Sequence, residues 1–87
     1  MKKKNEKFLK ELLETPSPTG SEEPVAALVR ERLCDVADEI QTNTMGSVHA
    51  VLDGKGEGPA LMLAAHMDEI GLMVRYVSDD GFLSVAA

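Results

Sequence analysis

The sequence lacks a second cysteine, an excess of positive charge and a long apolar run. With Cys34 as its only cysteine, it cannot form an internal disulfide. It has 9 basic and 15 acidic residues, and the net charge of −6 disfavours binding to nucleic acids and to anionic membranes. The apolar run Ala60–Ala65 is far too short to span a bilayer, and Lys2–Lys4 is not followed by the apolar segment of a secretory signal peptide. We therefore expect a cytoplasmic protein.

What the sequence does contain is typical of one small globular domain. Its 87 residues allow one domain at most, with a modest buried fraction and marginal stability. Hydrophobic residues at 44% and charged residues at 28% are ordinary for such a chain. Cys34 falls on the apolar face of a predicted helix, with no cationic residue obviously beside it. We therefore expect it to be a small buried hydrophobe and not a reactive thiol.

Two helices are predicted in the first half of the chain. Apolar residues at helical spacing, with lysines and glutamates between them, predict a helix over 4–14. Two prolines and a glycine within 15–20 then break this helix. Ser21 is a good N-cap for a second helix running to about Ala37, and Pro24 is tolerated in its first turn.

The second half of the chain carries the patterns of short strands. They are expected at 39–44, 47–52, 60–65, 72–77 and 82–85. The run Ala60–Ala65 is apolar at every position, which is typical of a strand buried on both faces, and Asp53-Gly54 before it is a hairpin signal. Helices followed by strands predict an α/β fold in which two helices pack on a small mixed or antiparallel sheet.

The candidate site follows the predicted buried strand, at His66-Met67-Asp68-Glu69. Alternate strand residues point to one side, so His66 and Asp68 share a side and Glu69 points the other way. A neutral imidazole binds zinc, cobalt and related cations through one ring nitrogen, and a carboxylate can accept the proton of the other nitrogen. On this interpretation His66 is a metal ligand and Asp68 orients it.

Other interpretations of these residues stay open. Taken alone, His66-x-Asp68 is also compatible with a solvated turn after a core strand, because short motifs match by chance. His49 lies on the polar side of a predicted strand, where it is either a second metal ligand or simply a solvated side chain.

Three stretches together carry a more specific signal. They are Leu13–Val25, which contains Pro16-Ser-Pro-Thr-Gly-Ser-Glu22, then Met45–Ala50, and then Ala65–Val74 followed by Gly81-Phe-Leu83. In this order and spacing they resemble the tetrahedral, or glutamyl (deblocking), aminopeptidases, some of which are also labelled endoglucanase-like. The resemblance covers nearly the whole chain. It implies an α/β metallopeptidase fold of which residues 1–87 are the partial N-terminal portion of the catalytic domain.

The resemblance also implies an activity and a metal site. Family members use two divalent cations, such as zinc or cobalt, to hydrolyse N-terminal residues from peptides, and they assemble into homo-oligomers. The histidine matching His66 binds one cation, and the aspartate matching Asp68 orients that histidine.

The chain also departs from the family pattern. Asn43-Thr-Met-Gly46-Ser47 replaces the usual Asp-x-x-Gly-Asn. The metal-bridging aspartate, the glutamate pair that includes the general base and the remaining ligands have no counterpart in these residues. We therefore expect the chain alone to be inactive and to hold at most one cation weakly. The alternative is a non-catalytic truncated remnant, or a docking fragment that binds a full-length partner and has no activity of its own.

Overall fold

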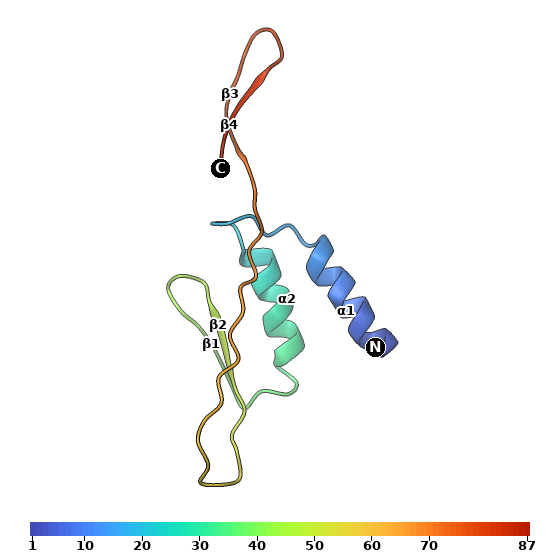
Figure 1. Ribbon diagram of the computed structural model, residues 1–87, viewed down its shortest axis with the longest axis vertical. Coiled ribbons are helices and arrows are strands. Elements are labelled where there is room, and N and C mark those ends of the chain that lie inside the picture. The colour runs from blue at the N-terminus through green and yellow to red at the C-terminus, as the bar shows by residue number, and fades with distance from the viewer.

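The computed structural model describes residues 1–87 and consists of two helices followed by two hairpins (Figure 1). In chain order the elements are α1 (Lys3–Glu14), α2 (Glu23–Leu33), β1 (Glu39–Thr42), β2 (Val48–Val51), β3 (Met73–Val77) and β4 (Leu83–Ala86). The predicted α/β class is confirmed, and the strands form two separate antiparallel sheets of two strands each. Neither helix is long and apolar enough to cross a bilayer.

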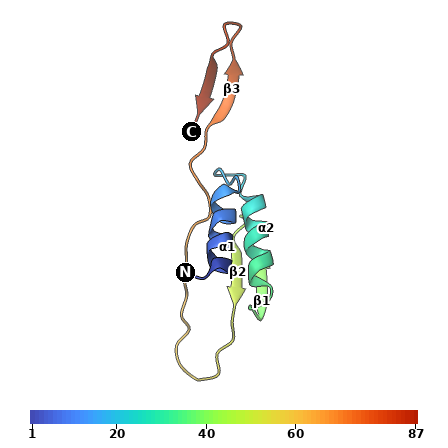
Figure 2. The same cartoon turned by 90° about the vertical axis from the view of Figure 1, so that its right-hand side faces the viewer.

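The two helices lie side by side and are joined by a few specific contacts (Figure 2). The guanidinium carbon of Arg32 in α2 lies 4.6 Å from the ring centroid of Phe8 in α1. The same guanidinium donates a hydrogen bond to Asn5 Oδ1 at 3.0 Å. The buried apolar residues are Val25 and Ala26, both at the beginning of α2. The small core of the chain therefore lies at the beginning of α2.

The ends of α2 differ from the sequence prediction. The helix begins after Glu22 and not after Ser21, because the Ser21 N–H donates to the Pro18 carbonyl at 2.8 Å and closes the preceding turn. It ends at Leu33, earlier than expected. Cys34 follows the last helical residue and is exposed, so the prediction of a buried cysteine was wrong. A side chain just past the end of a helix no longer lies on its packed apolar face.

The first hairpin, β1–β2, forms where alternating β-branched and polar residues predicted it. Thr42 pairs with Val48 at the turn end of the ladder. Asn43 closes the turn, because its side-chain oxygen accepts hydrogen bonds from the N–H groups of Met45 and Ser47, each at 3.0 Å. Asn is favoured in such positions because its short side chain can replace a backbone acceptor. α2 contacts β2 and so covers one side of this hairpin.

The prediction of a buried strand at Ala60–Ala65 was wrong. These residues form no strand, and the exposed fraction reaches 86% at Leu61 and 89% at Leu63. β1 pairs only with β2, and β3 pairs only with β4, so neither two-stranded ladder extends to the backbone of this run. The hairpin expected at Asp53-Gly54 does not form either, because the residues that follow it form no strand.

The second hairpin, β3–β4, stands away from the rest of the molecule (Figures 1 and 2). The chain is elongated as a result, with principal extents of 65 × 32 × 17 Å. Every residue of β3 is exposed, including the large apolar side chains Val74, Tyr76 and Val77. Exposed apolar surface of this extent is typical of a face that packs against another polypeptide.

Candidate metal-binding site

Two segments far apart in the sequence meet at the candidate site. Pro18 and Glu69 form an isolated parallel bridge. The Thr19 N–H donates to the Glu69 carbonyl at 3.2 Å, and the Glu69 N–H donates to the Ser17 carbonyl at 2.8 Å. Ser17 is only 4% exposed. The loop between the two helices is thereby fixed against the segment that carries His66 and Asp68.

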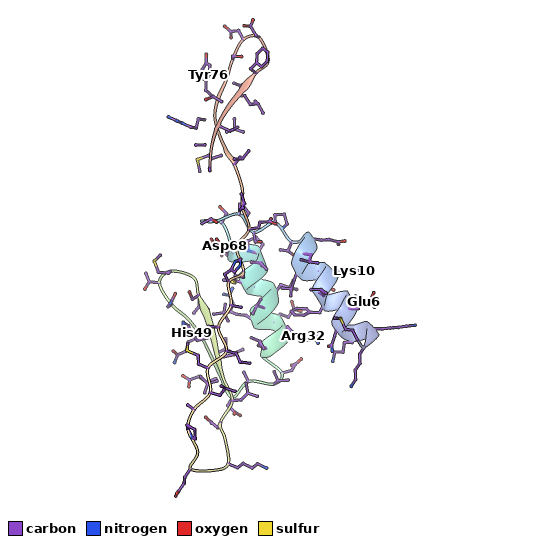
Figure 3. All side chains as sticks on the ribbon, in the orientation of Figure 1. Glu6, Lys10, Arg32, His49, Asp68 and Tyr76 are labelled. Carbon is purple, nitrogen blue, oxygen red and sulfur yellow. The ribbon has the colours of Figure 1, made fainter.

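Asp68 lies beside the beginning of α2 (Figure 3), and each oxygen of its carboxylate has a different partner. Oδ1 lies 2.9 Å from His66 Nδ1. Oδ2 accepts a hydrogen bond from the Thr19 hydroxyl at 2.6 Å. Acceptance by a carboxylate favours the tautomer of His66 that carries its proton on Nδ1.

The imidazole of His66 is open to solvent on its other side. Its side chain is 86% exposed, and its Nε2 has no hydrogen-bond partner within the chain. An accessible, unprotonated Nε2 is the form in which histidine binds a cation. The contact between His66 and Asp68 has the geometry that the sequence suggested, and the role of His66 as a ligand stays a prediction.

Glu69 has different hydrogen-bond partners from Asp68. Its side-chain Oε1 accepts a hydrogen bond from the Ser17 N–H at 3.1 Å, in addition to the two backbone bonds of the bridge. The sequence pattern predicted that Glu69 points away from His66, and it indicated no role for this residue. In the structure it anchors the 15–20 loop. No local pattern marks this contact, because its two residues are 52 positions apart.

The remaining candidate ligands do not assemble around His66. His49 Nε2 lies 3.5 Å from the side-chain nitrogen of Asn43, within its own hairpin. Nowhere in the chain do three or more His, Cys, Asp or Glu side chains gather in a way that could hold a metal ion. The donor set therefore fits one coordination position, that of His66, and not a complete metal site.

An open hollow of about 730 Å³ lies between the helices and the segment 65–69. Its apolar wall includes Leu9 and Leu12 of α1 and Val25 and Val29 of α2. The backbone segment with the candidate ligand forms the facing wall. The apolar faces of the helices therefore meet this segment across unfilled space, which is why its side chains remain largely exposed.

The carboxyl group of Asp68 has a lowered pKa. The main cause is the hydrogen bond from the Thr19 hydroxyl, and the second is the hydrogen bond with His66, since both favour the charged form. Because the folded-state pKa lies below the ordinary 3.8, this contribution to stability is present above pH 3.8 and is lost as pH falls through the lowered pKa. We expect the Asp68 side-chain carbon to titrate below 3.8 in an NMR pH series. Thr19→Val should raise its midpoint; an unchanged midpoint would contradict the assigned cause.

Comparison with known proteins gives a consistent family signal. The family model described as M42 glutamyl aminopeptidase matches residues 46–87. The lysyl aminopeptidase of Pyrococcus furiosus is 43% identical over 79 residues, which are 90% of this chain and 22% of that protein. The glutamyl aminopeptidase of Lactococcus lactis subsp. cremoris is 32% identical over 78 residues, which are 88% of this chain and 22% of that protein.

A solved structure agrees with these sequence matches. The TET aminopeptidase of a marine sediment Thaumarchaeota archaeon superposes with a TM-score of 0.86 at 32% sequence identity. The match covers 95% of this chain and 23% of that chain. The chain therefore spans about a fifth of the length of the curated relatives it matches.

Proposed function

The chain is related in sequence and in fold to the M42 glutamyl aminopeptidases, and from this we propose that it is part of a metal-dependent aminopeptidase. Residues 1–87 form the N-terminal portion of the catalytic domain. The substrates are peptides with a free N-terminal residue, the enzyme works in the cytoplasm, and the whole protein is a homo-oligomer. The names of the matched relatives support the reaction class, and the TET neighbour supports assembly.

In this proposal His66 contributes one ligand to a site for two divalent cations, zinc or cobalt. When bound, such cations polarise a scissile carbonyl and lower the pKa of the attacking water. Asp68 is a positioning residue, because it acts on the cation only through the ring of His66. The observation that carries the proposal is the 2.9 Å contact between His66 Nδ1 and Asp68 Oδ1, which leaves Nε2 directed to an exposed surface.

The first test compares the two histidines of the chain during titration with Zn²⁺. We expect the ring resonances of His66 to shift at lower Zn²⁺ concentration than those of His49, because only His66 has an orienting carboxylate. Asp68→Asn should weaken the His66 response by about 10–100-fold, as expected for the loss of an orienting partner. Asp53→Asn serves as the matched control, since Asp53 contributes no side-chain contact to either histidine. Equal and shallow responses of both histidines would overturn the proposal.

A second candidate function is non-catalytic docking onto a full-length M42 aminopeptidase. It is favoured by the exposed apolar faces of the β3–β4 hairpin and of Leu61–Leu63, which nothing in the chain covers. The isolated position of His66 also supports it, since one ligand does not make a site. The Zn²⁺ titration distinguishes the two candidates, because docking requires no difference between His66 and His49.

A further inference from the structure

The contacts of Thr19 point to a function beyond closing a loop. Its hydroxyl donates to Asp68 Oδ2 at 2.6 Å, while the other oxygen of the same carboxylate contacts His66. Charge-assisted hydrogen bonds of this kind are shorter and stronger than those between neutral groups. Thr19, Asp68 and His66 thus form a continuous hydrogen-bonded chain that ends at the exposed imidazole.

Without a second partner, the carboxylate of Asp68 would not hold one orientation. The terminal torsion of an aspartate is broad, so an exposed carboxylate bonded to a single group can rotate. Thr19 is itself well fixed. Its N–H bonds to the Glu69 carbonyl at 3.2 Å, and its β-branched side chain has few rotamers. The hydroxyl therefore holds Oδ2 at a defined point, which places Oδ1 toward His66 Nδ1.

We propose that Thr19 is a positioning residue for the imidazole of His66, acting through the carboxylate of Asp68. The inference deepens the proposed function. Only its consequence for metal binding rests on that function. The effect on the histidine tautomer is independent of any metal. By fixing Asp68, Thr19 keeps the proton of His66 on Nδ1 and leaves Nε2 as the basic nitrogen.

Two weaker contacts accompany this arrangement. His66 Nδ1 also lies 3.2 Å from the Asp68 carbonyl oxygen, and the Thr19 hydroxyl lies 3.4 Å from the Glu69 carbonyl oxygen. Both distances are longer than those to the carboxylate, and both acceptors are neutral. Removing the hydroxyl should therefore weaken the preference for the Nδ1–H tautomer without abolishing every contact of the ring.

The chain contains a matched control for this inference. Thr15 lies in the same loop, and its hydroxyl donates to the Glu11 carbonyl at 2.6 Å, so it touches neither Asp68 nor His66. Thr15→Val and Thr19→Val each replace a hydroxyl group by a methyl group within the same loop. Thr19→Ser retains the hydroxyl and removes only the methyl group.

The test measures the ¹⁵N shifts of both His66 ring nitrogens without metal, about two pH units above the ordinary imidazole pKa of roughly 6.5. We expect Nδ1 protonated and Nε2 bare in the unmodified chain, in Thr15→Val and in Thr19→Ser. In Thr19→Val both shifts should move toward the average of the two tautomers. Ring shifts unchanged in Thr19→Val would overturn the inference, as would equal losses in Thr19→Ser and Thr19→Val, which would assign the effect to packing of the methyl group.

Zn²⁺ affinity supplies a second readout with a different dependence. Thr19→Val should weaken the His66 response to Zn²⁺ by less than the roughly 10–100-fold expected for Asp68→Asn. The reason is that Thr19 acts on His66 only through Asp68. If no variant binds Zn²⁺ at His66 while the tautomer still depends on the Thr19 hydroxyl, the proposed metal site fails and the positioning role stands. Amide spectra of the β1–β2 hairpin check that each variant remains folded.

Discussion

The purified 87-residue chain is expected to release no product from aminoacyl chromogenic substrates, with or without added Zn²⁺ or Co²⁺. A catalytic zinc site needs about three protein ligands and one open position, and a two-metal site needs a bridge that holds the ions roughly 3.5–4 Å apart. The chain supplies His66 alone, and no group of three potential ligands exists elsewhere in it. A cation held by one imidazole stays largely hydrated. It therefore does not bind a substrate carbonyl, and it does not lower the pKa of its bound water enough for catalysis.

The assay has a positive and a negative control. The lysyl aminopeptidase of Pyrococcus furiosus, of which the chain spans 22%, should turn over in the same buffers with the same metals. His66→Ala should match the unmodified chain at background. Metal-dependent turnover by the chain that disappears in His66→Ala would contradict the expectation. It would mean that ligands from several copies assemble into one working site.

The elements predicted well from the sequence are those whose partners are near in the chain. The spacing of apolar residues in α1 describes the helix almost to the residue, because helical hydrogen bonds join positions four apart. β1 and β2 are joined by a short turn that Asn43 closes, so one hairpin satisfies both strands. In each case the residues that bond to one another also carry the pattern.

Ala60–Ala65 failed as a prediction because a strand is not a property of its own residues alone. Its apolar composition is correct for a strand buried on both faces, but such a strand needs neighbours along both edges. In this chain the run lies outside both two-stranded sheets and has a ladder along neither edge. The pattern therefore records a preference for burial that these 87 residues do not satisfy.

In the candidate site too, contacts between residues close in the sequence were predicted and contacts between distant residues were not. His66 and Asp68 are two residues apart, so strand alternation alone brought them together in the prediction. The partners of Asp68 and Glu69 in the 15–20 loop are 49 and 52 positions away and carry no local signature. In the sequence, the 15–20 loop and the segment that contains His66 are two separate motifs of the family resemblance. In the structure, Thr19 and Glu69 join them.

Gly71 lies directly against Pro18 at this junction. A Cβ atom added at Gly71 would lie 2.7 Å from Pro18 Cβ and 3.6 Å from Pro18 Cα. Nonpolar carbons pack best about 3.5–4.0 Å apart, so the first contact forces a displacement. The ring of Pro18 locks its φ angle and leaves the side chain little room to turn aside. The 15–20 loop and the segment around Gly71 must therefore move apart, which separates the loop from Asp68 and Glu69.

Gly71→Ala is expected to release the loop and to break the contacts that hold Asp68. The Thr19–Asp68 bond is 2.6 Å long, and a shift of about 1 Å takes it beyond hydrogen-bond distance. Overpacking of this kind costs about 1–3 kcal/mol, and we expect the amides of Thr19 and Glu69 to lose hydrogen-exchange protection accordingly.

Two sets of variants test whether the clash with Pro18 causes the loss of hydrogen-exchange protection. One places a methyl group at another glycine, and the other removes the Cβ atom of Pro18. Gly54→Ala adds a methyl group where no atom lies within 4 Å and should leave exchange unchanged. In the Gly71→Ala background, Pro18→Gly removes the clashing Cβ and should restore part of the protection, whereas Pro18→Ala keeps that atom and should not. Full protection in Gly71→Ala itself would mean that the loop adapts without leaving the site, and that the close approach of Pro18 does not hold it there.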